Sequence, residues 1–467
     1  MDEEGSIIID DDNDDDYNDN DNHNDEERRY WIQHQENSSL TLSLTGHRRR
    51  RSVLIRYDKL PALANEILMQ RQQTAAATET TNVSSKDEWI EWDTEGWHYN
   101  GSGFNGTEDE RRERVALYLL ALDAINFCFW PLSEEKDDDD DDNKNKTAST
   151  SASATPAKKI NSNNNNRINL LEYDHLAMAL KKMAEADHVV SKSDNDDDDD
   201  DDDENNKKQQ QQQRNEYVFS PSNLATMTTE KMSNLLRPYL DESKYPLPNI
   251  QKRAQLWKEV GEGIIRDYNG AVLNLLNYAN QDASRLVELL LISFPGFRDD
   301  VYISSSSSSS SSQHQQQQQQ QRLVFLKRAQ IFVGDINAAL KLQLNGMERL
   351  TTFADYRVPQ VLRHWKILVY SSLLSNKVDN YIEIKKGSYE EISIRAATIV
   401  VVEELVKLLN RNNNNNNNDD DDDDGNNNNE RCRYTDVTVD WYLWQVGERM
   451  HQEGIMKPFH KVRTHFY

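Results

Sequence analysis

The sequence predicts a mainly α-helical protein that forms a single discontinuous domain and carries long low-complexity insertions. Apolar residues recur three and four positions apart far more often than they alternate, which is typical of amphipathic helices. No convincing series of strands is visible. Tracts of Asn, Asp, Gln and Ser separate the periodic blocks, and because such tracts have nothing to bury, we expect them to be solvated and disordered.

The biased tracts define the expected domain organisation. They comprise 125 of the 467 residues and cover positions 1–27, 133–165, 191–215, 303–321 and 410–430. The 342 residues that remain suffice for one large domain or two intimate ones. Since the entropic cost of closing a loop rises slowly with its length, a folded domain can carry such insertions. We expect a disordered N-terminal segment over residues 1–52, acidic and then basic, and one helical domain over residues 53–467.

The first expected helices each have one apolar stripe. One stripe consists of Leu256, Val260, Ile264 and Tyr268, and the next consists of Leu286, Leu289, Leu290 and Phe294. Pro295 and Gly296 then break the chain, so the second helix should end there.

Further helices follow in the C-terminal part of the chain. The block from Phe325 to Leu344 and the block from Val358 to Leu373, with Pro359 in its first turn, both repeat the helical spacing. Ser388 and Glu391 form an S-x-x-E capping box, which predicts a helix that continues towards Leu409. The aromatic segment from Asp436 to Met450 completes the helical series.

The net charge of −27 comes from the tracts and not from the expected folded part. Residues 1–27 and the runs Asp137–Asp142, Asp196–Asp203 and Asp419–Asp424 hold 34 of the 81 acidic residues, so the remainder has 54 basic and 47 acidic residues. This weak positive charge is unlike the concentrated basic surface of a protein that binds duplex nucleic acid, but it tolerates a small anionic ligand. We expect no stable nucleic acid complex.

Cysteine content and hydropathy favour a cytoplasmic protein. Cys128 and Cys432 form neither a CxxC pair nor a disulfide framework, as is usual in a reducing compartment. The N-terminus is acidic where a secretory signal would be basic, and no stretch of about 18 apolar residues is present, so we expect neither export nor membrane insertion. Arg48–Arg51 is compatible with access to the nucleus, although a solvated basic linker is the commoner explanation of so short a cluster.

The usual signatures of nucleotide hydrolysis, hydride transfer, serine hydrolysis and zinc catalysis are absent. The sequence contains no GxxxxGK[ST], GxSxG, HExxH or Rossmann glycine pattern. No His pairs with another His or Cys at the spacing of metal ligands. We therefore predict neither a metal site nor an organic cofactor.

Charged residues instead cluster with aromatic residues in four short stretches. These are FPGFRD from Phe294, FLKRAQ from Phe325, FADYRVPQVL from Phe353 and DWYLW from Asp440. Aromatic faces beside fixed charges suit a planar heterocycle with polar substituents. Periodicity alone favours core positions for most of these rings and a helix cap for Asp355, and it leaves an exposed basic edge open for Lys327 and Arg328.

The same stretches belong to a longer series of motifs that follow one another along the chain. The series comprises W-H at Trp97, D-x-x-N-F-x-F-W from Asp123, F-P-x-F-R-D from Phe294, K-R-A-Q-I from Lys327, F-A-D-Y-R-V-P-Q-V-L from Phe353, I-R at Ile394, D-W-Y-L-W from Asp440 and P-F-H-x-x-R-x-x-F-Y from Pro458. In this order the motifs resemble the queuosine salvage proteins, the queuosine 5′-phosphate N-glycosylase family. The resemblance extends over most of the ordered part of the chain.

The resemblance implies a largely helical fold similar to that of DNA glycosylases. It also implies an enzyme that hydrolyses the N-glycosidic bond of queuosine 5′-phosphate, which yields ribose 5-phosphate and the base queuine for salvage into tRNA. Asp355 is then the catalytic carboxylate and Lys327 an active-site cation. Asp355 would stabilise the positive charge that develops at the anomeric carbon, activate water, or both. Queuine is a 7-deazaguanine without an N7 to protonate, so catalysis must depend on the sugar side.

The resemblance and the chemistry of the substrate also suggest substrate-binding residues. They are His98, Phe129, Arg357, Asp440, Trp441 and Trp444. Lys327, or Arg357 as a second choice, would bind the 5′-phosphate, and either could instead hold Asp355 in place. Asp440 would face the cationic amine of the cyclopentenediol arm of queuine, and the three aromatic residues would stack on the rings.

Other functions remain compatible with the sequence. A non-catalytic protein that binds queuine or its nucleotide would keep the same pocket, and composition alone suggests an interaction protein driven by the tracts. A glycosylase of DNA or tRNA follows from the fold analogy, but the weak basicity disfavours a polymer substrate. The sequence indicates no membrane partner and does not reveal the oligomeric state.

Overall fold

The computed structural model describes residues 8–9, 42–43, 52–79, 104, 106–130, 171–192, 217–241, 247–304, 320–415 and 434–467. Its α-helices are α2 (Leu60–Glu79), α3 (Glu108–Ala124), α4 (Tyr173–Lys192), α6 (Pro221–Ala225), α7 (Thr229–Leu236), α8 (Ile250–Tyr268), α9 (Val272–Tyr278), α10 (Ala283–Ser293), α11 (Lys327–Ala339), α12 (Arg357–His364), α13 (Ser372–Asp379), α14 (Tyr389–Asn415) and α15 (Asp436–Gln452). The predicted mainly α-helical fold class is confirmed. No helix in the described part of the chain is long and apolar enough to cross a membrane.

Short antiparallel strand pairs join segments that are distant in sequence. The pairs are β1 (Ile8–Ile9) with β2 (Leu42–Ser43), β3 (Val53–Ile55) with β6 (Leu368–Tyr370), and β4 (Asp300–Ser304) with β5 (Gln320–Val324). Ser304 of β4 lies opposite Gln320 of β5, so this pairing brings together the two ends of the Ser and Gln tract. Strands of two to five residues are too short to produce a clear alternation in the sequence.

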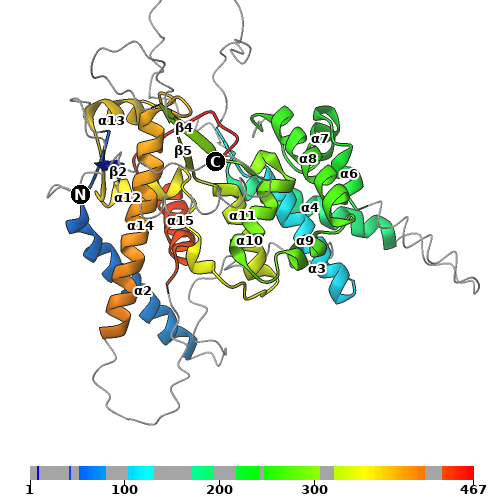
Figure 1. Cartoon of the computed structure of the whole chain (residues 1–467), viewed down its shortest axis with the longest axis horizontal. Helices are drawn as coiled ribbons and strands as arrows, with labels where there is room; N and C mark the ends of the chain where they lie inside the picture. The colour runs from blue at the N-terminus through cyan, green and yellow to red at the C-terminus, as the bar shows by residue number, and fades with distance from the viewer. Residues whose placement is uncertain are drawn as a thin grey trace, which may run out of the picture.

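The helices pack around two hydrophobic cores, and the two groups of helices lie side by side in Figure 1. The larger core involves α3, α4 and the helices from α6 to α11, and the second involves α2, α12, α14 and α15 with the β3–β6 pair. Phe353 and Tyr356 belong to the larger core, whereas Val358 belongs to the second. The FADYR motif therefore lies where the two cores meet.

The predicted apolar stripes and helix starts agree with the structure. All residues of the two stripes in α8 and α10 are buried, including Phe294 just after α10. At the start of α14, Ser388 Oγ accepts a hydrogen bond from the Glu391 N–H at 3.3 Å, while the Glu391 carboxylate binds the N–H of Gly387. The predicted aromatic helix is α15.

Two expected helices are shorter than the apolar pattern predicts. The helix predicted between Phe325 and Leu344 is α11, which ends at Ala339 because Lys341 and Gln343 adopt left-handed backbone conformations. The pattern that ends at Leu373 is not one helix, since Lys366 has a φ of 58° and the chain then enters β6.

The break at Lys366 changes the environment of the last two apolar residues of that pattern. Val369 lies in the middle of β6 and is 39% exposed, and Leu373 in α13 is 56% exposed. The prediction that the helical spacing continues through these two residues is wrong. A strand presents alternate residues to opposite faces, so a stripe at helical spacing cannot continue through it.

Gly261 allows α6 and α8 to pack at close range. A Cβ at this position would lie 2.2 Å from the backbone nitrogen of Ala225 and 2.5 Å from the carbonyl oxygen of Pro221. We expect Gly261→Ala to lower the free energy of unfolding by about 1–3 kcal/mol, because the two helices must separate. Urea denaturation measures this change. Glu262→Ala, an exposed neighbour in α8, should change the stability by less than about 0.5 kcal/mol, and equal stability of the two variants would contradict the prediction.

Candidate active site

Asp355 lies immediately before α12, where the two cores meet. Its residue exposure is 6%, and its Oδ1 accepts hydrogen bonds from the N–H groups of Arg357 at 2.8 Å and Val358 at 3.2 Å. Asp355 therefore caps the first turn of α12, as the sequence predicts. Burial raises the pKa of Asp355, and the charge of Lys327 is the strongest influence that opposes this rise.

Lys327 is the first residue of α11 and is only 2% exposed. Its Nζ donates a hydrogen bond to the carbonyl oxygen of Asn126 at 3.0 Å. Burial lowers the pKa of Lys327 to about 8, and among the acidic groups Asp355 opposes this change most. Arg328 is buried as well, so the interpretation of these two residues as an exposed basic edge is wrong.

Buried cations also hold the irregular segment that follows α3. Arg328 donates a hydrogen bond to the carbonyl of Ala124, the last residue of α3, and Arg253 donates to the carbonyls of Ile125, Phe127 and Cys128 in this segment. These donors are needed because the carbonyl groups of a buried segment outside helices and strands have no regular backbone hydrogen bonds. Together with Lys327 they fix the course of the chain up to Phe129 and Trp130.

Asp440 projects from α15 and is buried close to Asp355. Its Oδ1 accepts hydrogen bonds from Thr352 Oγ1 and, at 2.8 Å, from the N–H of Phe353. Burial, and after it the charge of Asp355, raises the pKa of Asp440 well above its usual value. The side chain thus holds the backbone just ahead of Asp355, and its surroundings favour the neutral acid.

A third carboxyl group, that of Asp123 at the end of α3, lies near Lys327. It is fully buried, and neither oxygen has a hydrogen-bond partner of normal geometry among the described residues. Burial raises its pKa well above the usual value, and the charges of Lys327 and Arg328 oppose this rise. Lys327 is therefore surrounded by acidic groups, of which Asp355 interacts with it most strongly.

Arg395 of α14 connects a buried ion pair to the backbone beside Asp355. Its Nε donates to the carbonyl oxygen of Ala354 at 3.0 Å, and its two Nη atoms bind the two carboxylate oxygens of Asp299 at 3.0 and 2.5 Å. The guanidinium carbon lies 4.0 Å from the ring centroid of Phe325. Since Ala354 directly precedes Asp355, this contact restrains the loop that carries the candidate catalytic carboxylate.

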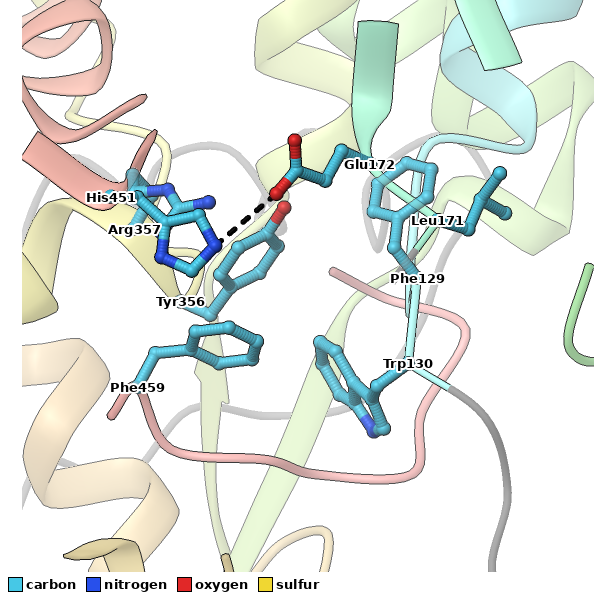
Figure 2. Close-up of a pocket in the computed structure, with 8 residues that line it drawn as sticks. All are labelled: Phe129, Trp130, Leu171, Glu172, Tyr356, Arg357, His451 and Phe459. Carbon is cyan, nitrogen blue, oxygen red and sulfur yellow. Dashed lines mark ion pairs between the residues drawn. The ribbon is translucent and has the colours of Figure 1, made fainter. Parts of the chain in front are cut away.

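A pocket opens to solvent beside this loop, and the space in and in front of it, open solvent included, is about 260 Å³. Its aromatic lining consists of Phe129, Trp130, Tyr356 and Phe459 (Figure 2). The rings of Tyr356 and Phe459 have centroids 4.7 Å apart, and the ring of Trp130 meets each of them at 5.6 Å. Such a lining suits an apolar or planar ligand group.

Two ion pairs contribute the charges of this pocket. Glu172 Oε1 lies 3.2 Å from His451 Nε2, and Figure 2 shows the two side chains facing one another at one edge of the pocket. Arg357 Nε donates to Glu448 Oε1 at 2.7 Å. The hydrogen bond with His451 lowers the pKa of Glu172, so this carboxylate stays ionised at neutral pH.

The structure brings some of the predicted site residues together and separates others. Asp355, Lys327 and Asp440 form one buried group, in which the charges of Asp355 and Asp440 shift the pKa of Lys327 and the charges of Asp355 and Lys327 shift the pKa of Asp440. Phe129 and Arg357 line the adjoining pocket. Trp441 and Trp444 are not part of that lining. Trp441 Cζ2 would lie 3.3 Å from a Cβ on Gly334, Trp444 packs edge to face on Tyr173 at 5.6 Å, and His98 lies outside the described residues.

Sequence reasoning missed six of the pocket residues, which are Trp130, Leu171, Glu172, Tyr356, His451 and Phe459. Trp130, Tyr356 and Phe459 lie inside motifs of the series, so the motifs could have identified them. Glu172 and His451 lie outside the motifs and 279 positions apart in the sequence, and only the fold brings them together. No group of three or more His, Cys, Asp or Glu side chains within the described ranges could hold a metal ion.

Comparison with known proteins places this site in a family context. The profile of the queuosine salvage protein family matches residues 207–467, which is more than half of the chain. The queuosine 5′-phosphate N-glycosylase/hydrolase of Dictyostelium discoideum is 28% identical over 380 residues, which cover 80% of this chain and 85% of the relative.

Two further relatives have the same name. The protein of Sphaerobacter thermophilus is 27% identical over 361 residues, which cover 76% of this chain and 82% of the relative. The mouse protein is 26% identical over 254 residues, which cover 54% of this chain and 67% of the relative. The matched region includes Lys327, Asp355, Arg357 and Asp440, and the chain belongs to the queuosine salvage protein family.

Proposed function

We propose that the protein hydrolyses the N-glycosidic bond of queuosine 5′-phosphate and releases queuine and ribose 5-phosphate. The names of its relatives support this reaction. The observation that carries the proposal is the buried carboxylate of Asp355, which has a buried cation, Lys327, and an aromatic pocket beside it. The reaction consumes one water molecule.

Asp355 is proposed to act on the sugar. Cleavage of the C–N bond leaves positive charge on the anomeric carbon, and a fixed carboxylate in a dry site stabilises such a charge strongly. Both hydrogen bonds to Asp355 from described residues go to Oδ1. Oδ2 is therefore available to face the anomeric carbon or to orient the attacking water.

Asp440 and the aromatic residues are proposed to bind the base. A neutral or proton-sharing Asp440 suits the uncharged N–H groups of the guanine-like edge. Phe129 lines the pocket, and Trp441 and Trp444 extend from the same helix as Asp440. His98 remains a proposed ligand contact.

Lys327 is proposed to keep Asp355 ionised and not to bind the phosphate. Its Nζ is buried against the Asn126 carbonyl, and a phosphate would have to be desolvated deeply to reach it. The loss of Lys327 should therefore harm turnover of queuosine and of queuosine 5′-phosphate by the same factor. A selective loss on the phosphorylated substrate would instead favour a phosphate contact.

The variant Lys327→Met should change the pH profile of kcat/KM in a definite direction. Activity requires Asp355 ionised and Lys327 protonated, so it should rise through the elevated pKa of Asp355 and decline above about pH 8. Without the cation the pKa of Asp355 rises further, so the acid limb should move to higher pH and the alkaline limb should disappear. Lys258→Met, at an exposed position, is the control. An acid limb at the same pH in Lys327→Met and in the wild-type protein would contradict the role of Lys327.

The reaction itself is tested with the purified full-length chain and synthetic queuosine 5′-phosphate. We expect queuine and ribose 5-phosphate to appear in equal amounts, measured by chromatography and mass spectrometry. Binding of the nucleotide without any release of base would instead support the non-catalytic binding protein.

A further inference from the structure

We propose that Glu172, oriented by His451, binds the protonated amine that links the cyclopentenediol arm of the substrate to its deazaguanine ring. This inference rests on the proposed function and names a residue that selects the substrate at the same site. It assigns the pocket beside Asp355 to the arm of the base.

The first argument is the composition of the pocket. Its walls are aromatic, and its lining includes the carboxylate of Glu172. This carboxylate contacts the imidazole of His451, and no Lys or Arg side chain of the described residues forms a short ion pair with it. The guanidinium in the lining, that of Arg357, is already paired with Glu448 at 2.7 Å. An apolar ring that carries a positive charge complements such a site, because its ring can pack on aromatic faces while its charge meets the carboxylate.

The second argument is the direction of the Glu172 side chain. The contact with His451 Nε2 at 3.2 Å engages Oε1, and no described residue donates to Oε2. The imidazole donates from Nε2 to Oε1 and so fixes the orientation of the carboxylate. With 27% of its side chain exposed, Glu172 is accessible to a ligand and remains shielded enough for a strong charge-assisted hydrogen bond.

The third argument is the comparison with Asp440, to which the sequence assigned the amine. Asp440 Oδ1 already accepts two hydrogen bonds, and its buried surroundings favour the neutral acid. Glu172 has the opposite properties, since its pKa is lowered and it lines open space. An ammonium group should therefore bind Glu172, and Asp440 is left for the uncharged edge of the base.

The fourth argument concerns the other charged part of the substrate. Glu172 lines the pocket and would repel the 5′-phosphate, and the guanidinium of the lining, Arg357, is already paired with Glu448. Tyr356, which lines the pocket, follows Asp355 directly in the chain. The pocket thus adjoins the bond to be broken and suits the base side of that bond.

The test compares two nucleotides, queuosine 5′-phosphate and 7-deazaguanosine 5′-phosphate, which lacks the arm. We expect Glu172→Gln to lower kcat/KM for queuosine 5′-phosphate by roughly 10-fold to 100-fold, mostly through KM, and to leave kcat/KM for 7-deazaguanosine 5′-phosphate within about twofold. Asp174→Asn, which removes the same charge from an exposed position two residues away, is the matched control and should change neither value. Equal losses on both nucleotides would overturn the inference.

Binding of free bases separates the amine from the hydroxyl groups of the arm. The probes are queuine, 7-aminomethyl-7-deazaguanine and 7-deazaguanine, measured through quenching of tryptophan fluorescence or by calorimetry with the full-length protein. Glu172→Gln should weaken the first two by a similar factor and leave the third unchanged. A loss for queuine alone would assign Glu172 to the diol and overturn the amine contact.

Inhibition by ribose 5-phosphate tests the competing assignment of the pocket to the phosphate. If the pocket binds phosphate, Glu172→Gln should tighten this inhibition, and that result would overturn the inference. Failure of the wild-type protein to release base from either nucleotide would refute the proposed reaction instead. The base-binding measurements would still report on Glu172 in that case, so the two failures are distinguishable.

Discussion

The variant Asp355→Asn is expected to release queuine at least about 10³-fold more slowly than the wild-type protein. An amide cannot supply the negative charge that stabilises the developing cation at the anomeric carbon, and it is a far weaker base towards water. The measurement is single-turnover release of queuine from queuosine 5′-phosphate at saturating protein. The loss should appear in the rate constant and not in the affinity for the nucleotide.

The fold of this variant should be preserved. The Asn side-chain oxygen can still accept the hydrogen bonds that Oδ1 receives from Arg357 and Val358, so α12 remains capped. Asp282→Asn is a matched control, because Asp282 caps α10 through the N–H of Arg285 at 2.8 Å and lies outside the proposed site. Full activity of the Asp355→Asn protein, with a melting temperature equal to that of the control, would eliminate Asp355 as the catalytic carboxylate.

The variant Arg395→Met is expected to lose about 3–5 kcal/mol of its free energy of unfolding. The substitution leaves the carboxylate of Asp299 buried without its bidentate partner, in a site where both side chains are almost completely enclosed. Urea denaturation measures the effect. Arg349→Met, which removes the exposed partner of Asp282, should cost less than about 1 kcal/mol.

The double variant Arg395→Met, Asp299→Leu distinguishes stability from positioning. Removal of both charges should restore part of the stability, because a buried ion pair contributes little net stability compared with apolar residues of similar size, although Glu391, 3.9 Å from Arg395, still lacks its cation. The rate of queuine release should nevertheless stay low, since the Ala354 carbonyl still lacks the Nε donor that restrains the loop of Asp355. Recovery of both stability and rate would show that Arg395 is merely structural.

The sequence predicted those parts of the fold that depend on local patterns. The stripes of α8 and α10 and the cap of α12 by Asp355 follow from periodicity and capping chemistry. β6 escaped prediction because its pairing partner, β3, lies more than 300 residues earlier in the chain. Its three residues carry no pattern of their own that could outweigh the helical spacing around them.

The candidate site was predictable only in part, for the same physical reason. Lys327 was assigned through a motif, but its burial depends on the Asn126 carbonyl, which a different segment supplies. The pairing of Glu172 with His451 and the link from Arg395 to Ala354 are products of tertiary packing. A motif identifies which groups matter, whereas the charge state and the orientation of their side chains depend on neighbours that are distant in the sequence.

The β4–β5 pair makes the start of α11 insensitive to the length of the Ser and Gln repeat. The Ser and Gln repeat joins Ser304 to Gln320, which are register partners, so its two points of attachment adjoin each other at any repeat length. Each doubling of a flexible connection raises the free energy of closure by only about 0.6 kcal/mol. Codon expansions or contractions in this repeat would therefore leave the start of α11, and with it the Lys327 ammonium, in place.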